Sequence, residues 1–354
     1  MASQAVESGL AVKAGDFAIR GVVCAIPAYK IGNDAFHAAF GEASVADVVK
    51  MIGVQSRHQV GPDQTSADLC QAAAERLLAE LGWEKDSVDA LLFISQTPDY
   101  RLPATACALH GRLALKSGCA AFDVNLGCSG YVYGLWLAAR LLDGVAVKRV
   151  LLLAGDTISK TVNPADRATA LLFGDAGTAT AIEFDRAAAP SCFVLGTDGS
   201  GEKNLIIAQG AYRQYDGGDA RMEGRDPACL YMDGGEIFNF TLKRVPQLVA
   251  DLVALGGRDK DEVDLFLFHQ ANTFMLKHIV KKSKIPAERA PINMDRYGNT
   301  SVASIPLLLA EQVGAGAARP STVAMVGFGV GYSWAAALLE IGPLAVSRII
   351  EVAP

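Results

Sequence analysis

The chain has 354 residues, of which 51% are hydrophobic and 20% are charged, and its formal net charge at pH 7 is -6. This composition excludes a disordered or fibrous protein, and the acidic balance argues against non-specific binding to nucleic acid. The seven cysteines are scattered and form no C-x-x-C pair. That pattern argues against a disulfide framework or a structural zinc site, and it favours the reducing cytoplasm.

Residues 1–17 show no clear periodicity, and we expect them to be poorly ordered. They also lack a basic segment followed by an apolar run, so the sequence predicts no signal peptide. Residues 209–235 are rich in glycine, aspartate and arginine, which predicts a surface loop. The uncharged stretch 321–339 is long enough to span a membrane, but its alternating glycines favour a strand, a turn and a second strand.

A short motif occurs twice along the chain. Residues 74–82 predict an amphipathic helix that ends at glycine, and residues 88–94 predict a buried strand after it. Residues 248–256 and 263–268 repeat the same order. Further short apolar runs predict strands covered by helices on both faces, at 121–124, 150–153 and 322–326. We therefore expect a layered α/β protein whose two similar halves meet near residue 185.

Cys128 is the first candidate for chemistry. It lies between Gly127 and Gly130, where a strand is expected to end near Asn125 and an apolar, deeply buried helix to begin near Cys128. The dipole at a helix N-terminus favours a thiolate and lowers the pKa of a thiol, and a thiolate can attack a thioester. Taken alone, the local sequence favours an inert buried cysteine.

Two polar residues further along could complete a catalytic site. His269 follows an apolar run and is expected at the end of a buried strand, the edge of the sheet where α/β enzymes place their chemistry. Asn299 could donate its amide to a developing negative charge. The local sequence alone favours a core histidine and a turn asparagine. The glycines that flank Val330 could form an oxyanion hole, or they could simply let two strands pack closely.

In this order, these segments resemble the ketoacyl synthase III family (3-oxoacyl-acyl-carrier-protein synthase III). The resemblance runs from Gly53-Val54-Gln55-Ser56-Arg57-His58 to about Glu340, and it is densest around Cys128, at 172–177, at 269–272, at 298–304 and at 327–334. It implies a thiolase-like fold with two duplicated βαβαβαββ halves, here residues 1–185 and 186–354, in a five-layered α-β-α-β-α arrangement. It also implies a homodimer, and no metal or other cofactor.

The resemblance assigns a role to each candidate. Cys128 would take an acyl group from acyl-CoA. His269 and Asn299 would hydrogen-bond the thioester carbonyl of malonyl-acyl-carrier protein, the second substrate, while carbon dioxide leaves. The backbone N–H groups of Cys128 and Val330 would form the oxyanion hole. The implied reaction is a decarboxylating Claisen condensation that gives a 3-oxoacyl-acyl-carrier protein.

The resemblance also implies an acyl pocket and a docking surface. Leu102 takes the position that lines the pocket of the neighbouring subunit, and Phe173 is expected in the pocket as well. Because acyl carrier protein is acidic, its docking patch should be basic. The residues expected to contact the carrier or CoA are Lys50, Asn272, Lys277, Lys281 and Lys282. Spacings of three and four place Lys277, Lys281 and Lys284 near one face of the helix expected after His269, and Lys243 and Arg244 would add to the patch. A solvated helix face would explain the same lysines equally well.

The chain departs from the family pattern at several positions. Residues 47–52 lack the tryptophan and arginine that grip CoA in housekeeping members, and Val330 stands in the middle of a turn usually written Gly-Gly-Gly. Neither Thr273 nor Phe274 is basic, and Asn239 replaces a frequent lysine. Leu102 replaces a larger aromatic residue. These changes favour a longer or unusual acyl donor and a specialised member of the family over a two-carbon initiator.

Three other functions would account for part of this residue pattern. A Cys–His pair could acylate an oxygen or nitrogen without decarboxylation, although the presence of Asn299 favours the enolate step. An inactive, acyl-binding ketosynthase-like subunit would be expected to lack Cys128, His269 or Asn299. A plain thiolase would need a second active-site cysteine near the C-terminus, whereas the last cysteine here is Cys229.

Overall fold

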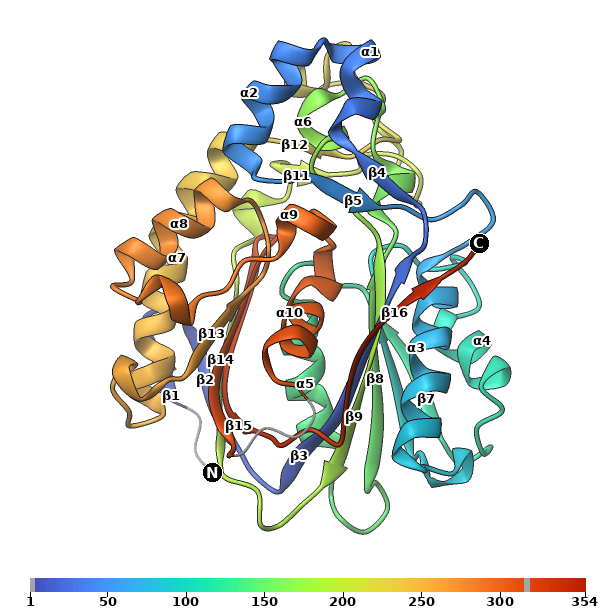
Figure 1. Ribbon diagram of the computed structural model, residues 1–354, viewed down its shortest axis with the longest axis vertical. Coiled ribbons are helices and arrows are strands. Elements are labelled where there is room, and N and C mark those ends of the chain that lie inside the picture. The colour runs from blue at the N-terminus through green and yellow to red at the C-terminus, as the bar shows by residue number, and fades with distance from the viewer. Residues whose placement is uncertain (1–3, 315–318) are drawn as a thin grey trace.

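The computed structural model describes residues 4–314 and 319–354. Its centre consists of two mixed sheets that face each other across a layer of helices (Figure 1). The first sheet has the spatial order β16 (Val346–Val352), β3 (Phe17–Pro27), β9 (Ala176–Phe184), β8 (Arg149–Asp156), β6 (Ala90–Ile94) and β7 (Ala120–Val124). The second has the order β1 (Gln4–Val6), β2 (Gly9–Ala14), β10 (Ser191–Thr197), β15 (Ser333–Ile341), β14 (Ser321–Gly329) and β13 (Leu265–Phe268).

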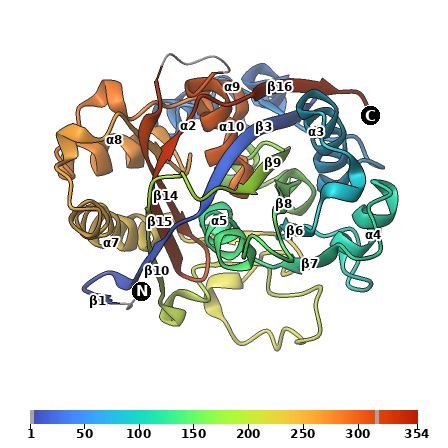
Figure 2. The ribbon, with the colours of Figure 1, turned by 90° about the horizontal axis from the view of Figure 1, so that it is seen from below.

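Helices cover both faces of both sheets. α3 (Ser66–Leu81) and α4 (Thr105–Arg112) lie outside the first sheet, and α7 (Gly234–Leu255) and α8 (Thr273–Lys282) lie outside the second. α5 (Gly130–Leu141) and α10 (Ser304–Gln312) lie between the sheets (Figure 2). The five layers α-β-α-β-α that the sequence predicts are therefore confirmed.

The two sheets repeat one topology. β6 and β8 are parallel, and β9 runs antiparallel to both β8 and β3. β13, β14, β15 and β10 have the same relations in the same order. The helix–glycine–strand motif seen twice in the sequence becomes α3–β6 in one half and α7–β13 in the other. The division at residue 185 stays a prediction, because β2 and β16 each cross to the sheet of the other half.

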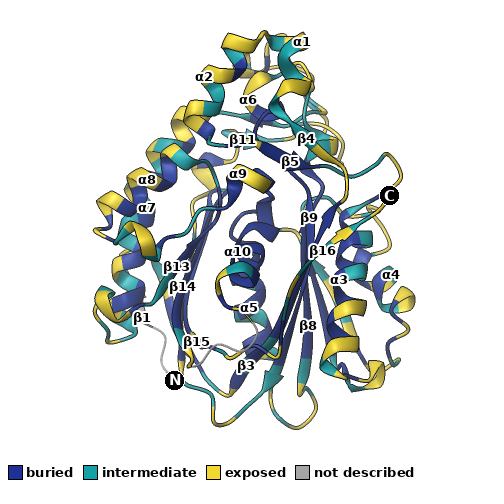
Figure 3. Cartoon of the chain, viewed as in Figure 1, coloured by how far each residue is buried: buried dark blue, intermediate teal, exposed yellow. Residues whose placement is uncertain are grey.

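The middle layer is largely buried, as Figure 3 shows for α5 and α10. A helix that is apolar all round belongs in a core rather than on a surface. In α5, Tyr131, Val132, Leu135 and Ala138 are all fully buried. The prediction of a deeply buried helix after Cys128 is therefore confirmed for one face of α5, whereas Trp136 and Leu137 are half-buried and Arg140 is exposed.

The expectation of a poorly ordered start is wrong for the described residues. β1 and β2 extend the edge of the second sheet, and Ala11 and Ala14 are buried there. Ser8 donates its backbone N–H to Asp251 Oδ2 at 2.9 Å, and its carbonyl accepts from Trp334 Nε1 at 2.6 Å. These two partners of Ser8 lie more than 240 residues away in the chain, so no local sequence pattern predicts the contacts.

One predicted strand is not covered as expected. β7 forms over 120–124, but among the described strands it pairs only with β6, at the edge of the first sheet. Phe122 is 37% exposed on it. The apolar run therefore indicates a strand but not burial within this chain, because the free edge of a sheet is completed only by another partner.

A small cap closes the upper end of the molecule in Figure 1. It is built from β4 (Lys30–Gly32), α1 (His37–Phe40), α2 (Glu42–Ile52), β5 (Ser56–His58), α6 (Arg167–Ala170), β11 (Leu205–Ile206) and β12 (Tyr231–Met232). Residues 209–230 are largely irregular, as the sequence predicts, but the expected end of this loop at residue 235 is wrong, because β12 and the start of α7 occupy its last residues. β14 and β15 confirm the strand–turn–strand reading of 321–339. Within the described ranges, no helix is both long and apolar enough to cross a membrane.

Candidate active site

Cys128 lies in the short connection between β7 and α5. The helix begins at Gly130 with Ser129 as its N-cap, which agrees with the expected helix start near Cys128. Both glycines of the connection are needed for packing. A Cβ at Gly127 would collide with Gln96 Oε1, and one at Gly130 would lie 2.7 Å from Ile94 Cγ2. This tight turn holds Cys128 only 8% exposed.

The protonation of the thiol differs from the expectation. Burial raises the pKa of Cys128 to about 11, while hydrogen bonds from the backbone of Val330 and of Cys128 itself act in the opposite direction. Desolvation disfavours the charged form of a buried thiol. The lowered pKa predicted from the helix dipole is therefore wrong for the unliganded protein, because the dipole and the N–H groups do not outweigh desolvation.

His269 follows β13 directly, at the end of a buried strand, as the sequence predicts. Its Nδ1 lies 2.8 Å from Ser304 Oγ, and its ring meets the Phe328 ring edge-on at 5.7 Å. Burial lowers the pKa of His269 to about 3, so the imidazole is neutral at pH 7. Since Nδ1 is engaged by Ser304, Nε2 is the ring nitrogen left to face a substrate.

Asn299 lies just after the short helix α9 (Met294–Tyr297) and is tied to the first half of the chain. Its backbone N–H donates to Leu172 O at 2.9 Å, and its carbonyl accepts from Gly174 N at 3.2 Å. Its side-chain oxygen accepts from the Ser301 N–H at 2.9 Å. Nδ2 donates to Ala271 O at 3.4 Å, so its second N–H is the group that Asn299 can offer to a ligand.

One cavity brings these residues together. Cys128, His269, Asn299 and Phe173 all line it, although they come from segments far apart in the sequence. Most of the other lining side chains are apolar: Leu172, Leu205, Met232, Ile237, Met275 and Phe328. Sequence reasoning identified Phe173 but missed these residues and Ser304. Apolar residues on a strand or helix carry no local signal that separates a cavity wall from the core.

The predicted docking residues lie in different settings. Asn272 lines the cavity and also caps α8, because its Oδ1 accepts from Met275 N at 2.7 Å. Lys277, Lys281 and Lys282 are exposed along α8. The helix ends at Lys282, so the expectation that Lys284 shares its face is wrong.

Three further predicted residues lie away from the cavity lining. Lys50 is exposed on α2 and pairs with Asp47 at 3.3 Å. Arg244 lies over the Trp334 ring at 4.7 Å, which directs its guanidinium toward the N-terminal strands. Leu102 is 76% exposed, so it contributes nothing to the pocket of its own chain.

The raised pKa of Cys128 predicts how the unliganded protein reacts with an alkylating agent. The thiolate fraction should grow about tenfold per pH unit below the thiol pKa. We expect the rate of Cys128 alkylation by iodoacetamide to keep rising from pH 6 to pH 10 without a plateau. Peptide mass spectrometry of Cys128 against time would measure it. A plateau below pH 8 would contradict the structure, because it would require a thiolate stabilised beyond the contacts described above.

Comparisons with known proteins agree with this geometry. The family model described as 3-oxoacyl-[acyl-carrier-protein (ACP)] synthase III matches residues 122–199, and the model of its C-terminal part matches residues 254–341. A putative 3-oxoacyl-[acyl-carrier-protein] synthase 3 of Campylobacter jejuni is 34% identical over 346 residues, which cover 94% of this chain and 96% of the relative. A beta-ketoacyl-[acyl-carrier-protein] synthase III of Xanthomonas axonopodis is 34% identical over 81% of this chain and 87% of the relative.

Solved structures give the same result. A 3-oxoacyl-(acyl-carrier protein) synthase of Burkholderia xenovorans superposes with a TM-score of 0.96 and 51% identity, over 98% of this chain and 100% of that chain. A beta-ketoacyl-[acyl carrier protein] synthase III of Thermus thermophilus superposes with a TM-score of 0.82 and 34% identity, over 92% of this chain and 99% of that chain. The likeness thus extends over nearly the whole of this chain and nearly the whole of each solved chain.

Proposed function

The chain belongs to the 3-oxoacyl-[acyl-carrier-protein] synthase III family, and we propose that it joins an acyl group carried on Cys128 to the carbanion released from malonyl-acyl-carrier protein. The observation that carries this proposal is the single cavity lined by a buried thiol, a neutral imidazole and a primary amide. The product is a 3-oxoacyl-acyl-carrier protein. Side chains and backbone N–H groups of the chain supply the acid–base and hydrogen-bonding chemistry of each step.

The first step loads the enzyme. Cys128 Sγ forms a bond to the carbonyl carbon of an acyl thioester, and the bond from that carbon to the sulfur of CoA breaks. The thiol proton leaves with the CoA sulfur, so CoA departs as a free thiol. Backbone N–H groups of Cys128 and Val330, which hydrogen-bond the sulfur in the resting protein, would donate to the transient oxyanion. Because the free thiol has a raised pKa, its deprotonation accompanies the attack.

The second step generates the carbanion. The bond between the malonyl methylene and its carboxylate breaks, carbon dioxide leaves, and the electron pair enters an enolate. His269 Nε2–H and Asn299 Nδ2 donate to the thioester oxygen and stabilise that charge. Ser304 Oγ accepts from Gln270 N at 3.3 Å, and its hydroxyl proton is free to be donated to His269 Nδ1. In the tautomer in which Nδ1 accepts that bond, the proton of the neutral ring resides on Nε2, where it can be donated.

Condensation closes the cycle. The enolate carbon attacks the acyl carbonyl on Cys128, a carbon–carbon bond forms, and the bond from that carbonyl to Sγ breaks. Sγ then takes up a proton and returns to the resting thiol. The apolar lining of the cavity excludes water, which limits hydrolysis of the acyl-enzyme.

We place acyl carrier protein over the exposed lysines of α8, Lys277, Lys281 and Lys282, with Asn272 at the cavity entrance and Lys50 near the phosphates of CoA. The cytoplasm, which supplies both thioesters, is the proposed compartment. The departures from the family pattern at Leu102 and Phe274 support a longer or unusual acyl donor.

We also propose a homodimer that forms across β7. This strand leaves one edge unpaired within the described chain, and Phe122 on it is 37% exposed. Tyr100 and Leu102, in the loop after β6, are 57% and 76% exposed. Such a run of apolar surface is typical of an interface. In the dimer, Leu102 of each subunit would reach the acyl pocket of the other.

Phe122→Asp tests the dimer, because it would place a charge in that interface. We expect the variant to elute as a monomer and to lose most of its acyl loading, since each pocket would lack the Leu102 of the partner. Light scattering during size-exclusion chromatography would measure the mass. Phe274→Asp, on an exposed face of α8, is the matched control and should remain dimeric. A wild-type protein that is monomeric at micromolar concentration would exclude the interface.

Intact-mass spectrometry tests the proposed reaction. The protein would be mixed with a panel of acyl-CoA and acyl-carrier thioesters, and malonyl-acyl-carrier protein would then be added. We expect a mass gain on Cys128 for the preferred donor, which disappears as a 3-oxoacyl-carrier product and carbon dioxide form. Transfer of the acyl group to an oxygen or nitrogen acceptor, without consumption of the malonyl thioester, would instead support the acyltransferase alternative.

A further inference from the structure

A buried carboxylate stands close to the proposed site, and the reaction scheme above does not use it. Asp156, the last residue of β8, is fully buried. Its Oδ1 accepts from Gln96 N at 2.7 Å, from Ser95 Oγ at 3.0 Å and from Thr97 Oγ1 at 3.2 Å. Its Oδ2 has no hydrogen-bond partner among the described residues. A buried carboxylate is costly unless it is hydrogen-bonded, so these contacts fix the turn that follows β6.

The turn fixed by Asp156 reaches the nucleophile. The side chain of Gln96 packs against Gly127, the residue before Cys128, so closely that any Cβ at position 127 would collide with Gln96 Oε1. The contact leaves the Cys128 loop little freedom on that side. On the opposite side, a Cβ at Gly329 would lie 2.8 Å from Cys128 Sγ. The thiol is thus held between the backbone at Gly127 and the backbone at Gly329, and Gln96 packs against the first of these.

The same turn also reaches the amide of the site. Ser301 Oγ lies 3.5 Å from Gln96 Oε1, and Ser301 N–H donates to Asn299 Oδ1 at 2.9 Å. Ser301 has a φ of 51°, a left-handed conformation that residues other than glycine adopt only where their surroundings impose it. Burial raises the pKa of both Cys128 and Asp156. Ser301 therefore connects Gln96, through its hydroxyl, with Asn299, through its backbone N–H.

We propose that Asp156 is a positioning residue for the condensation: through Gln96 and Ser301 it fixes the Cys128 loop and the Asn299 amide relative to each other. The two reacting thioesters are held by different loops, so their approach depends on the distance between those loops. A carboxylate that orders the connecting turn keeps that distance constant through both steps. This inference rests on the proposed function, because it assigns Asp156 a role in that reaction.

A double-mutant cycle between Asp156→Ala and Gln96→Ala tests the proposal. Each single variant should lower kcat for condensation about tenfold, which corresponds to about 1.4 kcal/mol. The KM for the acyl donor should stay within about twofold, because the cavity lining is intact. The double variant should be no slower than the slower of the two single variants, since both changes interrupt one chain of contacts. Asp156→Asn should recover part of kcat, because its amide oxygen can still accept from Gln96 N.

Asp251→Ala is the matched control. It also removes a carboxylate that holds a backbone N–H, a hydroxyl and an amide, namely those of Ser8 and Gln247. It should lower the melting temperature but leave kcat of the folded protein unchanged. The proposal is overturned if Asp156→Ala has the melting temperature of wild type and a kcat within twofold of it. It is also overturned if the changes in activation free energy caused by the Asp156 and Gln96 substitutions simply add.

If Asp156→Ala does not fold, the same cycle is run with Asp156→Asn and Gln96→Ala, and additive effects overturn the proposal again. The outcome is separable from the proposed function, because the wild-type protein is measured in the same assay. A wild-type protein that forms no acyl-Cys128 contradicts the function itself. A wild-type protein that condenses normally, beside an Asp156 variant that does the same, contradicts only the positioning role.

Discussion

Replacing Cys128 by alanine is expected to abolish the acyl-enzyme while malonyl-acyl-carrier protein is still decarboxylated. Condensation should fall by about 10⁴-fold or more, the scale seen when a catalytic nucleophile is removed. Carbon dioxide release should persist, because the enolate is stabilised by His269 and Asn299 and not by the thiol. Intact-mass spectrometry reports the first effect, and release of carbon dioxide from carboxyl-labelled malonyl-acyl-carrier protein reports the second.

Cys107→Ala is the matched control for this variant. Cys107 is exposed on α4, on the outer side of the first sheet, and is therefore the thiol most open to adventitious acylation. Its removal should leave both the mass gain and turnover intact. A mass gain that survives Cys128→Ala but disappears in Cys107→Ala would show that the label sits on a surface thiol. The nucleophile assignment would then be wrong, and the acyl-binding alternative would gain support.

Much of the fold can be predicted from local pattern, because buried strands and core helices have distinctive runs of apolar residues. The repeated helix–glycine–strand motif anticipated α3–β6 and α7–β13 correctly. The failures share one physical cause. β2 is ordered by β10, Asp251 and Trp334, and β7 is left uncovered because its edge faces away from the chain. In each case the deciding partner is distant or absent, so a window of neighbouring residues cannot contain it.

The site follows the same rule. Local sequence favoured structural rather than catalytic roles for Cys128, His269 and Asn299, and only their joint resemblance to a known family indicated catalysis. Even then the thiol pKa was predicted in the wrong direction, because desolvation is set by the two sheets that enclose the connection between β7 and α5. Ser304 and Asp156 were missed because their partners lie on other segments. A hydroxyl or carboxylate becomes informative only when its partners are known.

Removing either side chain that donates to the thioester carbonyl should have the opposite effect to Cys128→Ala: acylation should persist, and decarboxylation should be lost. Asn299→Ala and His269→Ala should each still take up the acyl group, since neither supplies the attacking sulfur. Each should lose decarboxylation and condensation by about 10²- to 10³-fold, the usual effect of losing one oxyanion donor. Rapid-quench measurement of carbon dioxide release separates this step from acylation, which intact mass records in the same samples.

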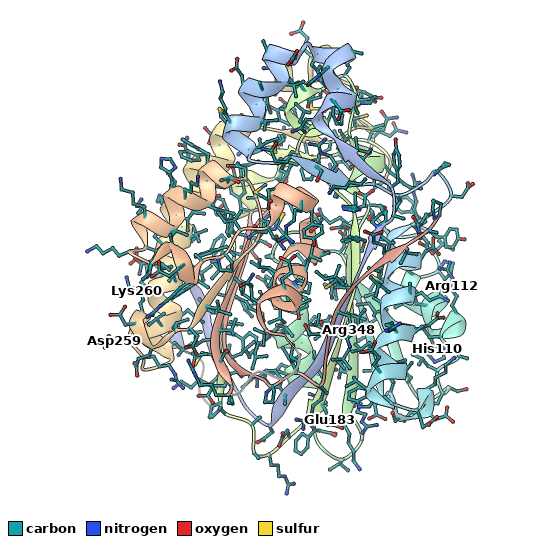
Figure 4. All side chains as sticks on the ribbon, viewed as in Figure 1. His110, Arg112, Glu183, Asp259, Lys260 and Arg348 are labelled. Carbon is teal, nitrogen blue, oxygen red and sulfur yellow. The ribbon has the colours of Figure 1, made fainter. Side chains whose placement is uncertain are left out.

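His110→Ala provides the control for loss of an imidazole, because His110 lies on α4, on the far side of the first sheet from α8 (Figure 4). Its ring contacts Lys116 O at 3.0 Å, so its loss affects local packing only and should leave decarboxylation unchanged. If Asn299→Ala decarboxylates as fast as wild type, the amide is not an enolate donor. The argument against acyl transfer to oxygen or nitrogen would then fail, because it depends on the enolate step needing two donors. If only the pair of variants together loses decarboxylation, either donor suffices alone, and the carbonyl is held by one hydrogen bond at a time.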